Sequence, residues 1–135
     1  MIADTSALLA LYNASEPMHE RVRAVVEESD GPLVVSPFVI AEIDYLLATR
    51  VGVDAEIAVL EELGSGAYVL PQLSAADIAA CARIVRAYGD QDIGVADASL
   101  VLLAQRYETR TVLTLDHRHF NVLRPLQGKR FVLLP

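Results

Sequence analysis

Short apolar runs alternate along the chain with longer segments in which apolar residues recur every three or four positions. The short runs predict buried strands at 1–3, 33–35, 68–70, 111–115 and 130–134. The periodic segments predict helices at 6–13, 18–29, 36–50, 54–63, 74–88 and 95–107. Because strands that alternate with helices form βαβ units, we predict the α/β class, as a three-layer α/β/α sandwich around a mostly parallel sheet.

Capping residues support two of these helix boundaries. Ser36 is placed to cap the helix that Pro37 begins, and Ser74 and Asp77 form a variant of the capping box. A length of 135 residues suffices for one domain, so we expect a single domain over residues 1–135.

Composition narrows the class of protein. Hydrophobic residues make up 53% of the chain, which argues against disorder. The single cysteine, Cys81, excludes an internal disulfide and is expected to fill space in the core. The sequence shows no signal peptide and no apolar segment of about 20 residues, so we expect a soluble, cytoplasmic protein with no membrane partner.

The charge of the chain bears on its partners. A net charge of −7 argues against a general nucleic-acid binder, because such proteins are usually basic. The charge is unevenly distributed, however. Residues 1–67 contain twelve acidic and three basic residues, whereas residues 68–135 contain six acidic and eight basic ones. The second half therefore offers cations that can contact phosphates.

Two carboxylates directly follow predicted strands, Asp4 after the first strand and Asp116 after the run 111–115. Ligands of parallel sheets bind beyond the carboxyl ends of the strands, so both should lie at the same edge. Asp97, in the first turn of one helix, and Glu42, in the second turn of another, are further candidates. Taken singly, three of them have ordinary explanations: Asp4 as a helix cap, Asp97 beside a helix dipole and Asp116 in a turn.

Helical periodicity does not decide between Glu42 and Asp44. The neighbours of Glu42 one turn away are all apolar or aromatic, namely Phe38, Val39, Tyr45 and Leu46. A solvent-facing position for Glu42 is therefore not expected. Asp44 also has apolar neighbours, so this helix is apolar nearly all round.

Several carboxylates that share a partly buried cleft need a compensating charge. Burial and mutual repulsion both disfavour the ionised forms, unless protons or a cation offset them. Oxygen ligands suit Mg²⁺ or Mn²⁺. Such a site serves metal-assisted hydrolysis of phosphodiesters, because the ion lowers the pKa of a bound water and neutralises charge on the phosphate.

Four motifs, in this order, carry a resemblance to a known family. They are Ile2-Ala3-Asp4-Thr5-Ser6, the helix start from Ser36-Pro37 to Ala41-Glu42, Ile93-Gly94-Val95-Ala96-Asp97-Ala98, and Val112-Leu113-Thr114-Leu115-Asp116 followed by His119-Phe120. The chain resembles the PIN-domain family and, within it, the VapC-type toxin ribonucleases of bacterial toxin–antitoxin pairs. The resemblance covers essentially the whole chain, and the ordered set is more specific than any one motif.

The resemblance implies an acidic Mg²⁺ or Mn²⁺ pocket and endoribonuclease activity. The acids of the family fall on Asp4, Glu42, Asp97 and Asp116. The resemblance thus selects Glu42 over Asp44. The small polar residue of the pocket falls on Thr5 or Ser6, of which we favour Ser6, and Asp92 is a possible extra acid at the rim. The family also implies a homodimer and a cognate VapB-like antitoxin.

This set of residues suggests a mechanism. One or two metal ions are expected among Asp4, Asp97 and Asp116, while Glu42 holds a ligand water or acts as a base. A metal-activated water attacks the scissile phosphorus in line and the 3′ oxygen leaves, which predicts 5′-phosphate and 3′-hydroxyl products.

Basic residues near the last acid are the candidate RNA contacts. Arg118, His119 and Arg110 are the first candidates, within the larger set that adds His117, Arg124, Lys129 and Arg130. A His-x-His metal site at 117 and 119 is the less favoured interpretation, because both lie on an expected turn. A tRNA or an rRNA is the expected substrate, and mRNA also stays open.

Two other functions fit parts of the pattern. A phosphoryl-transfer protein of the receiver or haloacid-dehalogenase type also places an Asp after its first strand in a Mg²⁺ pocket. The chain lacks the second Asp two residues later and a lysine after a late strand, since its only lysine is Lys129. A non-catalytic PIN scaffold for partner binding has no need to retain four mutually repelling acids.

Overall fold

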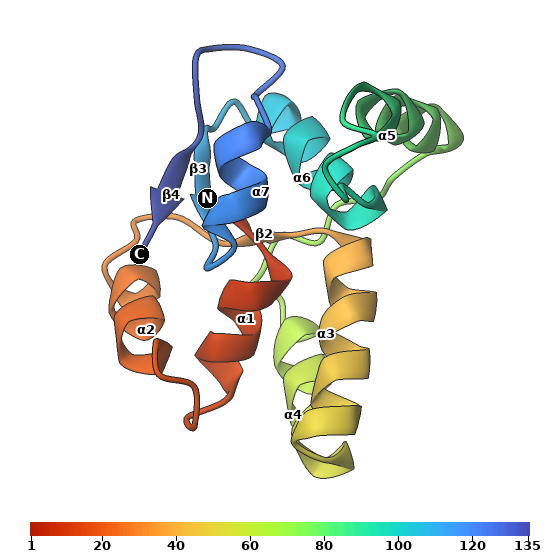
Figure 1. Cartoon of the computed structure of the whole chain (residues 1–135). Helices are drawn as coiled ribbons and strands as arrows, with labels where there is room; N and C mark the ends of the chain where they lie inside the picture. The colour runs from red at the N-terminus through yellow and green to blue at the C-terminus, as the bar shows by residue number, and fades with distance from the viewer.

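The computed structural model describes residues 1–135 and contains one four-stranded sheet (Figure 1). Its strands are β1 (Ile2–Ala3), β2 (Val34–Val35), β3 (Thr111–Leu113) and β4 (Val132–Leu134), in the spatial order β2-β1-β3-β4. Every pairing is parallel, and Ile2 of β1 lies between Val34 of β2 and Val112 of β3. The carboxyl ends of all four strands therefore meet at one edge, with β1 and β3 at the centre.

Seven helices surround this sheet (Figure 1). They are α1 (Thr5–Tyr12), α2 (His19–Glu27), α3 (Pro37–Arg50), α4 (Val53–Leu63), α5 (Ala75–Ala87), α6 (Val95–Arg106) and α7 (His117–Val122). Successive strand residues point to opposite faces, and both residues of β1 are fully buried. Helices thus cover both faces of the sheet, which confirms the predicted α/β/α sandwich. Cys81 lies in the 28-residue core, as expected.

The predicted caps connect the helices that carry the site. Ser36 caps α3 by accepting a hydrogen bond from the backbone N–H of Phe38 at 3.3 Å. Its buried hydroxyl also lies 2.7 Å from the Ser99 hydroxyl of α6, which donates to the carbonyl of Ala96. The start of α3 is thereby fixed against α6. The capping box of Ser74 and Asp77 is present at the start of α5.

Three sequence-based boundaries are wrong, each for a local reason. The strand predicted at 111–115 ends at Leu113: the N–H of Thr114 still donates to the carbonyl of Leu134 in β4, but the N–H groups of Leu115 and Asp116 donate to side-chain hydroxyls. The segment 68–70 is no strand: Val69 alone forms a bridge, with Val34. The turn expected after Asp116 is the helix α7, with Asp116 as its N-cap.

The third helix also differs from its predicted character. Its sequence is apolar nearly all round, yet only Val39, Ile43 and Leu47 are buried. Tyr45 is 67% exposed, so α3 buries one stripe and leaves apolar residues on its open side. None of the seven helices combines the length and the apolar character that a membrane crossing requires.

We expect Ser36→Ala to lower the free energy of unfolding by about 1–2 kcal/mol, because it removes a helix cap and a buried hydrogen bond together. Urea denaturation followed by circular dichroism measures this. Ser15→Ala, in an exposed turn, is the matched control and should change little. Equal stabilities for the two variants would show that the Ser36–Ser99 contact does not fix α3 against α6.

Candidate active site

An acidic cavity of about 410 Å³ opens at the carboxyl edge of the sheet. The starts of α1, α3, α6 and α7 surround it, and each of these elements contributes one predicted acid. Those acids are Asp4, Glu42, Asp97 and Asp116. Positions far apart in the sequence therefore face one cavity, together with Ser6 and His119.

Asp4 is held by two hydroxyl groups on the same carboxylate oxygen. Its Oδ2 accepts hydrogen bonds from Ser6 at 2.6 Å and from Thr114 at 2.8 Å. The residue occupies the N-cap position of α1, yet its side chain caps no backbone N–H. The ordinary cap interpretation of Asp4 is therefore wrong, and the carboxylate is turned toward the end of β3.

The same two hydroxyls also accept hydrogen bonds from the chain after β3. The backbone N–H of Leu115 donates to Ser6 Oγ at 2.9 Å, and that of Asp116 donates to Thr114 Oγ1 at 2.9 Å. From Leu115 onward these bonds take the place of pairing with β4. They also place Asp116 beside Asp4. Thr114, fully buried, is a positioning residue that the sequence interpretation missed.

Glu42, and not Asp44, faces the cavity. Thr5 of α1 donates its hydroxyl proton to Glu42 Oε2 at 2.7 Å. Glu42 is an exposed residue, contrary to the expectation from its apolar neighbours, because the cavity beside it is open. Asp44 instead interacts with Glu56 of α4, and this interaction between two carboxyl groups raises the pKa of Glu56. The two acids of α3 thus lie on different sides of the helix.

The environment of Asp97 disfavours its ionised form. Burial raises its pKa from 3.8 to about 6, and the charges of Asp4 and Asp116 add to this effect. A hydrogen bond from the backbone N–H of Gly94 and the nearby His119 act in the opposite direction. Asp97 thus retains a proton more readily than an ordinary aspartate, as expected for an acidic cluster without a bound cation.

His119 lies inside the cavity rather than on a surface turn. Its Nδ1 is 3.0 Å from Asp116 Oδ2 and 3.6 Å from Asp97 Oδ2. Its Nε2 lies 3.4 Å from a guanidinium nitrogen of Arg118. Because a guanidinium only donates, Nε2 accepts and the ring proton sits on Nδ1, where it is shared with Asp116. His117 is exposed, so the two histidines do not form a joint site.

Three of the carboxylates keep one oxygen free of protein donors. Asp4, Glu42 and Asp97 each use a single oxygen in the hydrogen bonds described above. No three acidic or histidine side chains are close enough to coordinate one ion directly. This spacing fits Mg²⁺, which usually binds one or two carboxylates and keeps several waters. The donor set therefore fits a hydrated divalent cation.

The cavity continues into a neighbouring hollow of about 270 Å³, which shares Asp92 and His119 with it. Arg118 lies on this side and approaches Asp92 to 3.5 Å. Both side chains are largely exposed, so this ion pair is weak. Asp92 is thus at the rim, as predicted, and its weak ion pair allows Arg118 to exchange this carboxylate for an anionic ligand.

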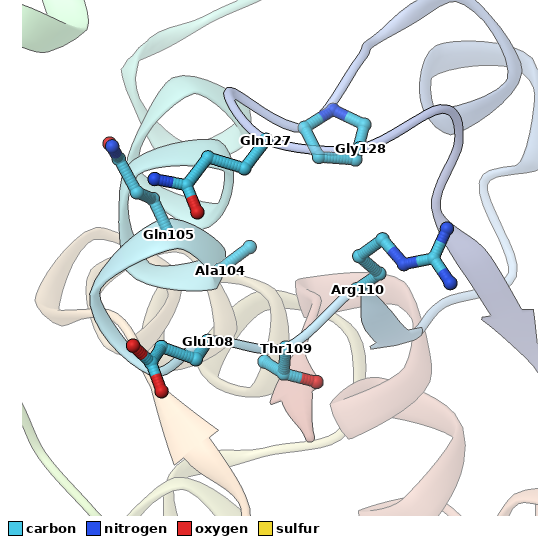
Figure 2. Close-up of a pocket in the computed structure, with 8 residues that line it drawn as sticks. Ala104, Gln105, Glu108, Thr109, Arg110, Gln127 and Gly128 are labelled. Atoms are coloured by element: carbon cyan, nitrogen blue, oxygen red, sulfur yellow. The ribbon is translucent and has the colours of Figure 1, made fainter.

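Arg110 does not belong to this site. It precedes β3 and therefore lies at the opposite, amino edge of the sheet. Figure 2 shows it beside Gly128 in a separate cavity of about 320 Å³, formed by the end of α6 and the loop 125–128. The structure therefore places this candidate RNA contact away from the acidic cavity, because a residue before a parallel strand and one after it lie at opposite edges.

The sequence matches the PIN domain family over residues 1–124. It is 59% identical to Ribonuclease VapC26 of Mycobacterium tuberculosis (strain ATCC 25618 / H37Rv) over 135 residues, the full length of both chains. Two solved structures share the fold. M. tuberculosis VapC20, described as a sarcin–ricin loop cleaving toxin, has a TM-score of 0.82 at 17% identity, over 94% of this chain and 98% of that chain. FitAcB of Neisseria gonorrhoeae has a TM-score of 0.59 at 21% identity, over 89% and 90% of the two chains.

The raised pKa of Asp97 predicts a pH-dependent stability in the absence of divalent cations. The folded state binds this proton more tightly than the unfolded state, so the stabilisation is present at low pH and is lost as the pH rises through about 6. Between about pH 4 and about pH 7, the free energy of unfolding of the wild-type chain should fall by about 1–3 kcal/mol more than that of Asp97→Asn.

Urea denaturation in EDTA at both pH values measures this difference. Asp92→Asn is the matched control, because that rim carboxylate is 89% exposed and Asn tolerates its left-handed backbone. A parallel pH dependence in the wild type and Asp97→Asn would contradict the assignment.

Proposed function

This chain belongs to the PIN domain family, as a ribonuclease toxin of the VapC type, and we propose that it hydrolyses RNA phosphodiester bonds in the acidic cavity with a divalent cation, Mg²⁺ or Mn²⁺. The proposed unit is a single PIN domain over residues 1–135. The observation that carries the proposal is the convergence of four carboxylates, three of them with a free oxygen, at the carboxyl edge of a parallel sheet.

Asp4, Asp97 and Asp116 are the proposed ligands of one or two cations, and at least one of them would bind through a water, because no three acids are close enough to coordinate one ion directly. The cation, when bound, neutralises charge on the phosphodiester and lowers the pKa of a water. Ser6 and Thr114 orient Asp4 through its Oδ2 and leave Oδ1 toward the cavity. His119 shares its Nδ1 proton with Asp116 and so limits the repulsion between Asp116 and Asp97.

Glu42 is the proposed proton acceptor. Thr5 occupies its Oε2, which fixes the rotation of the carboxylate and leaves Oε1 free to orient or deprotonate the attacking water. Attack by water, rather than by the ribose 2′-hydroxyl, yields a 5′-phosphate and a 3′-hydroxyl. The catalytic set is therefore Asp4, Glu42, Asp97 and Asp116, with Ser6 as the hydroxyl that positions Asp4.

The partners follow from the family assignment. We propose a VapB-like antitoxin that covers the acidic cavity, a homodimer, and tRNA or rRNA as the substrate. The cytoplasm is the proposed place of action, because these RNAs are there. Arg118, exposed beside His119 at the rim, is the proposed contact for a substrate phosphate.

We expect Asp4→Asn and Asp97→Asn to reduce RNA cleavage at least about 100-fold, because each removes a charge that holds the cation. Asp54→Asn, on the exposed face of α4, is the control and should cleave normally. Mapping of RNA 5′ ends shortly after induction in cells, for wild type beside each variant, measures the loss and identifies the target.

Product analysis of the same reactions tests the mechanism. A 5′-phosphate is expected at each new end. A 2′,3′-cyclic phosphate would show that the ribose hydroxyl attacks instead. Normal cleavage by both Asp4→Asn and Asp97→Asn would contradict the assignment of the acidic cavity as the active site.

Binding of the cation should itself depend on pH, because Asp97 must lose its proton to act as a ligand. We expect the affinity for Mn²⁺ to be about tenfold lower at about pH 5 than at about pH 7, as one proton is displaced. Isothermal titration calorimetry in two buffers of different ionisation enthalpy measures the affinity and the released proton. Absence of Mg²⁺ and Mn²⁺ binding at both pH values would favour a non-catalytic scaffold.

A further inference from the structure

Helices α1 and α3 leave the same edge of the sheet side by side and form two walls of the acidic cavity. On each helix the cavity-lining residues recur every four positions. They are Thr5 and Leu9 on α1, where Ser6 also lines the cavity, and Glu42, Leu46 and Arg50 on α3. These residues form one stripe on each helix, and the hydrogen bond from Thr5 to Glu42 fixes the two stripes in register.

The chemistry of the cavity changes along these stripes. The carboxylates occupy the end next to the sheet, and Leu9 and Leu46 follow one turn further along. Arg50 lies two turns from Glu42, which is about 12 Å along the helix axis at 1.5 Å per residue. Acidic, apolar and basic groups thus succeed one another in a single groove.

Arg50 is a cation that no protein group neutralises. Its exposed guanidinium makes no hydrogen bond and no ion pair, although it lines a cavity with four carboxylates. Arg106 and Arg118, by contrast, each approach a carboxylate. If Arg50 served to neutralise the acids, it would contact one of them. Its distance from them leaves it available to an anion at the far end of the groove.

We propose that Leu9, Leu46 and Arg50 form a subsite for the nucleotide next to the scissile phosphodiester, with Arg50 binding the neighbouring phosphate. This proposal rests on the proposed RNA cleavage. The guanidinium offers paired donors that match phosphate oxygens. Half-buried Leu46 offers an apolar surface for the ribose and base, to which the buried Leu9 adds little. The carboxylates repel any phosphate that a cation does not hold, so this second phosphate is seated only at the basic end.

The test uses the RNA fragment that the wild-type chain cuts, labelled with fluorescein, and the full-length chain with Arg50→Gln. Arg86→Gln is the matched control, because Arg86 is also an exposed arginine without a partner in the last turn of a helix. For Arg50→Gln we expect KM to rise about fivefold to tenfold with little change in kcat, since Arg50 contacts no reacting atom.

Salt dependence and substrate length provide readouts that a merely structural role would not change. The slope of log affinity against log salt should decrease by about 0.7 in magnitude for Arg50→Gln, as expected for one lost phosphate contact on a single strand. Arg50→Lys should retain the slope. Trimming the RNA from one end, one nucleotide at a time, should abolish the difference between wild type and Arg50→Gln at a single step.

Each other outcome contradicts a defined part of the argument. Equal effects of Arg50→Gln and Arg86→Gln, or a penalty that persists when every flanking nucleotide is removed, would overturn the subsite alone. A wild-type chain that cuts no RNA would overturn the proposed function as well. A lower melting temperature for Arg50→Gln would show a structural role instead, so thermal unfolding accompanies each assay.

Discussion

One carboxylate oxygen connects the halves of the site. Oδ2 of Asp4 accepts hydrogen bonds from the hydroxyls of Ser6 and Thr114. The same two hydroxyls accept hydrogen bonds from the backbone N–H groups of Leu115 and Asp116. The end of the first strand is thus bonded to the end of a strand more than a hundred residues later. These bonds direct the chain away from β4 after Thr114 and so present Asp116 beside Asp4. The arrangement of the cavity depends on this network more than on any single acid.

The parts of the fold that follow from repeated patterns could be predicted from the sequence, and the parts that depend on one side chain could not. Because parallel strands share a carboxyl edge, the sequence alone could predict that Asp4 and Asp116 lie close together. The same rule places Arg110, which precedes β3, at the opposite edge and away from the acidic cavity. Glu42 needed the family resemblance, because α3 is apolar on several sides while only one stripe is buried. The early end of β3 and the short helix α7 depend on hydroxyl and carboxylate hydrogen bonds, which leave no periodic signal.

The electrostatics of the cavity show a compromise between stability and chemistry. Hydroxyl groups, a backbone N–H and an imidazole each satisfy one oxygen of a carboxylate, and this partial solvation allows the chain to fold around four acids. It does not remove the cost, since burial still raises the pKa of Asp97 to about 6. A cation that enters such a cavity gains binding energy from repulsion already present in the folded chain, so its affinity is linked to the protonation of the acids.

The pairing of β1 between β2 and β3 also bears on how the molecule is made. Translation delivers Asp4 and Glu42 long before Asp97 and Asp116, and the central strand has only one of its two neighbours until residues 111–113 emerge. A polypeptide that ends between residues 42 and 97 therefore carries two of the four acids on an unfinished sheet. The complete set of carboxylates is therefore assembled only when the last third of the chain has been made.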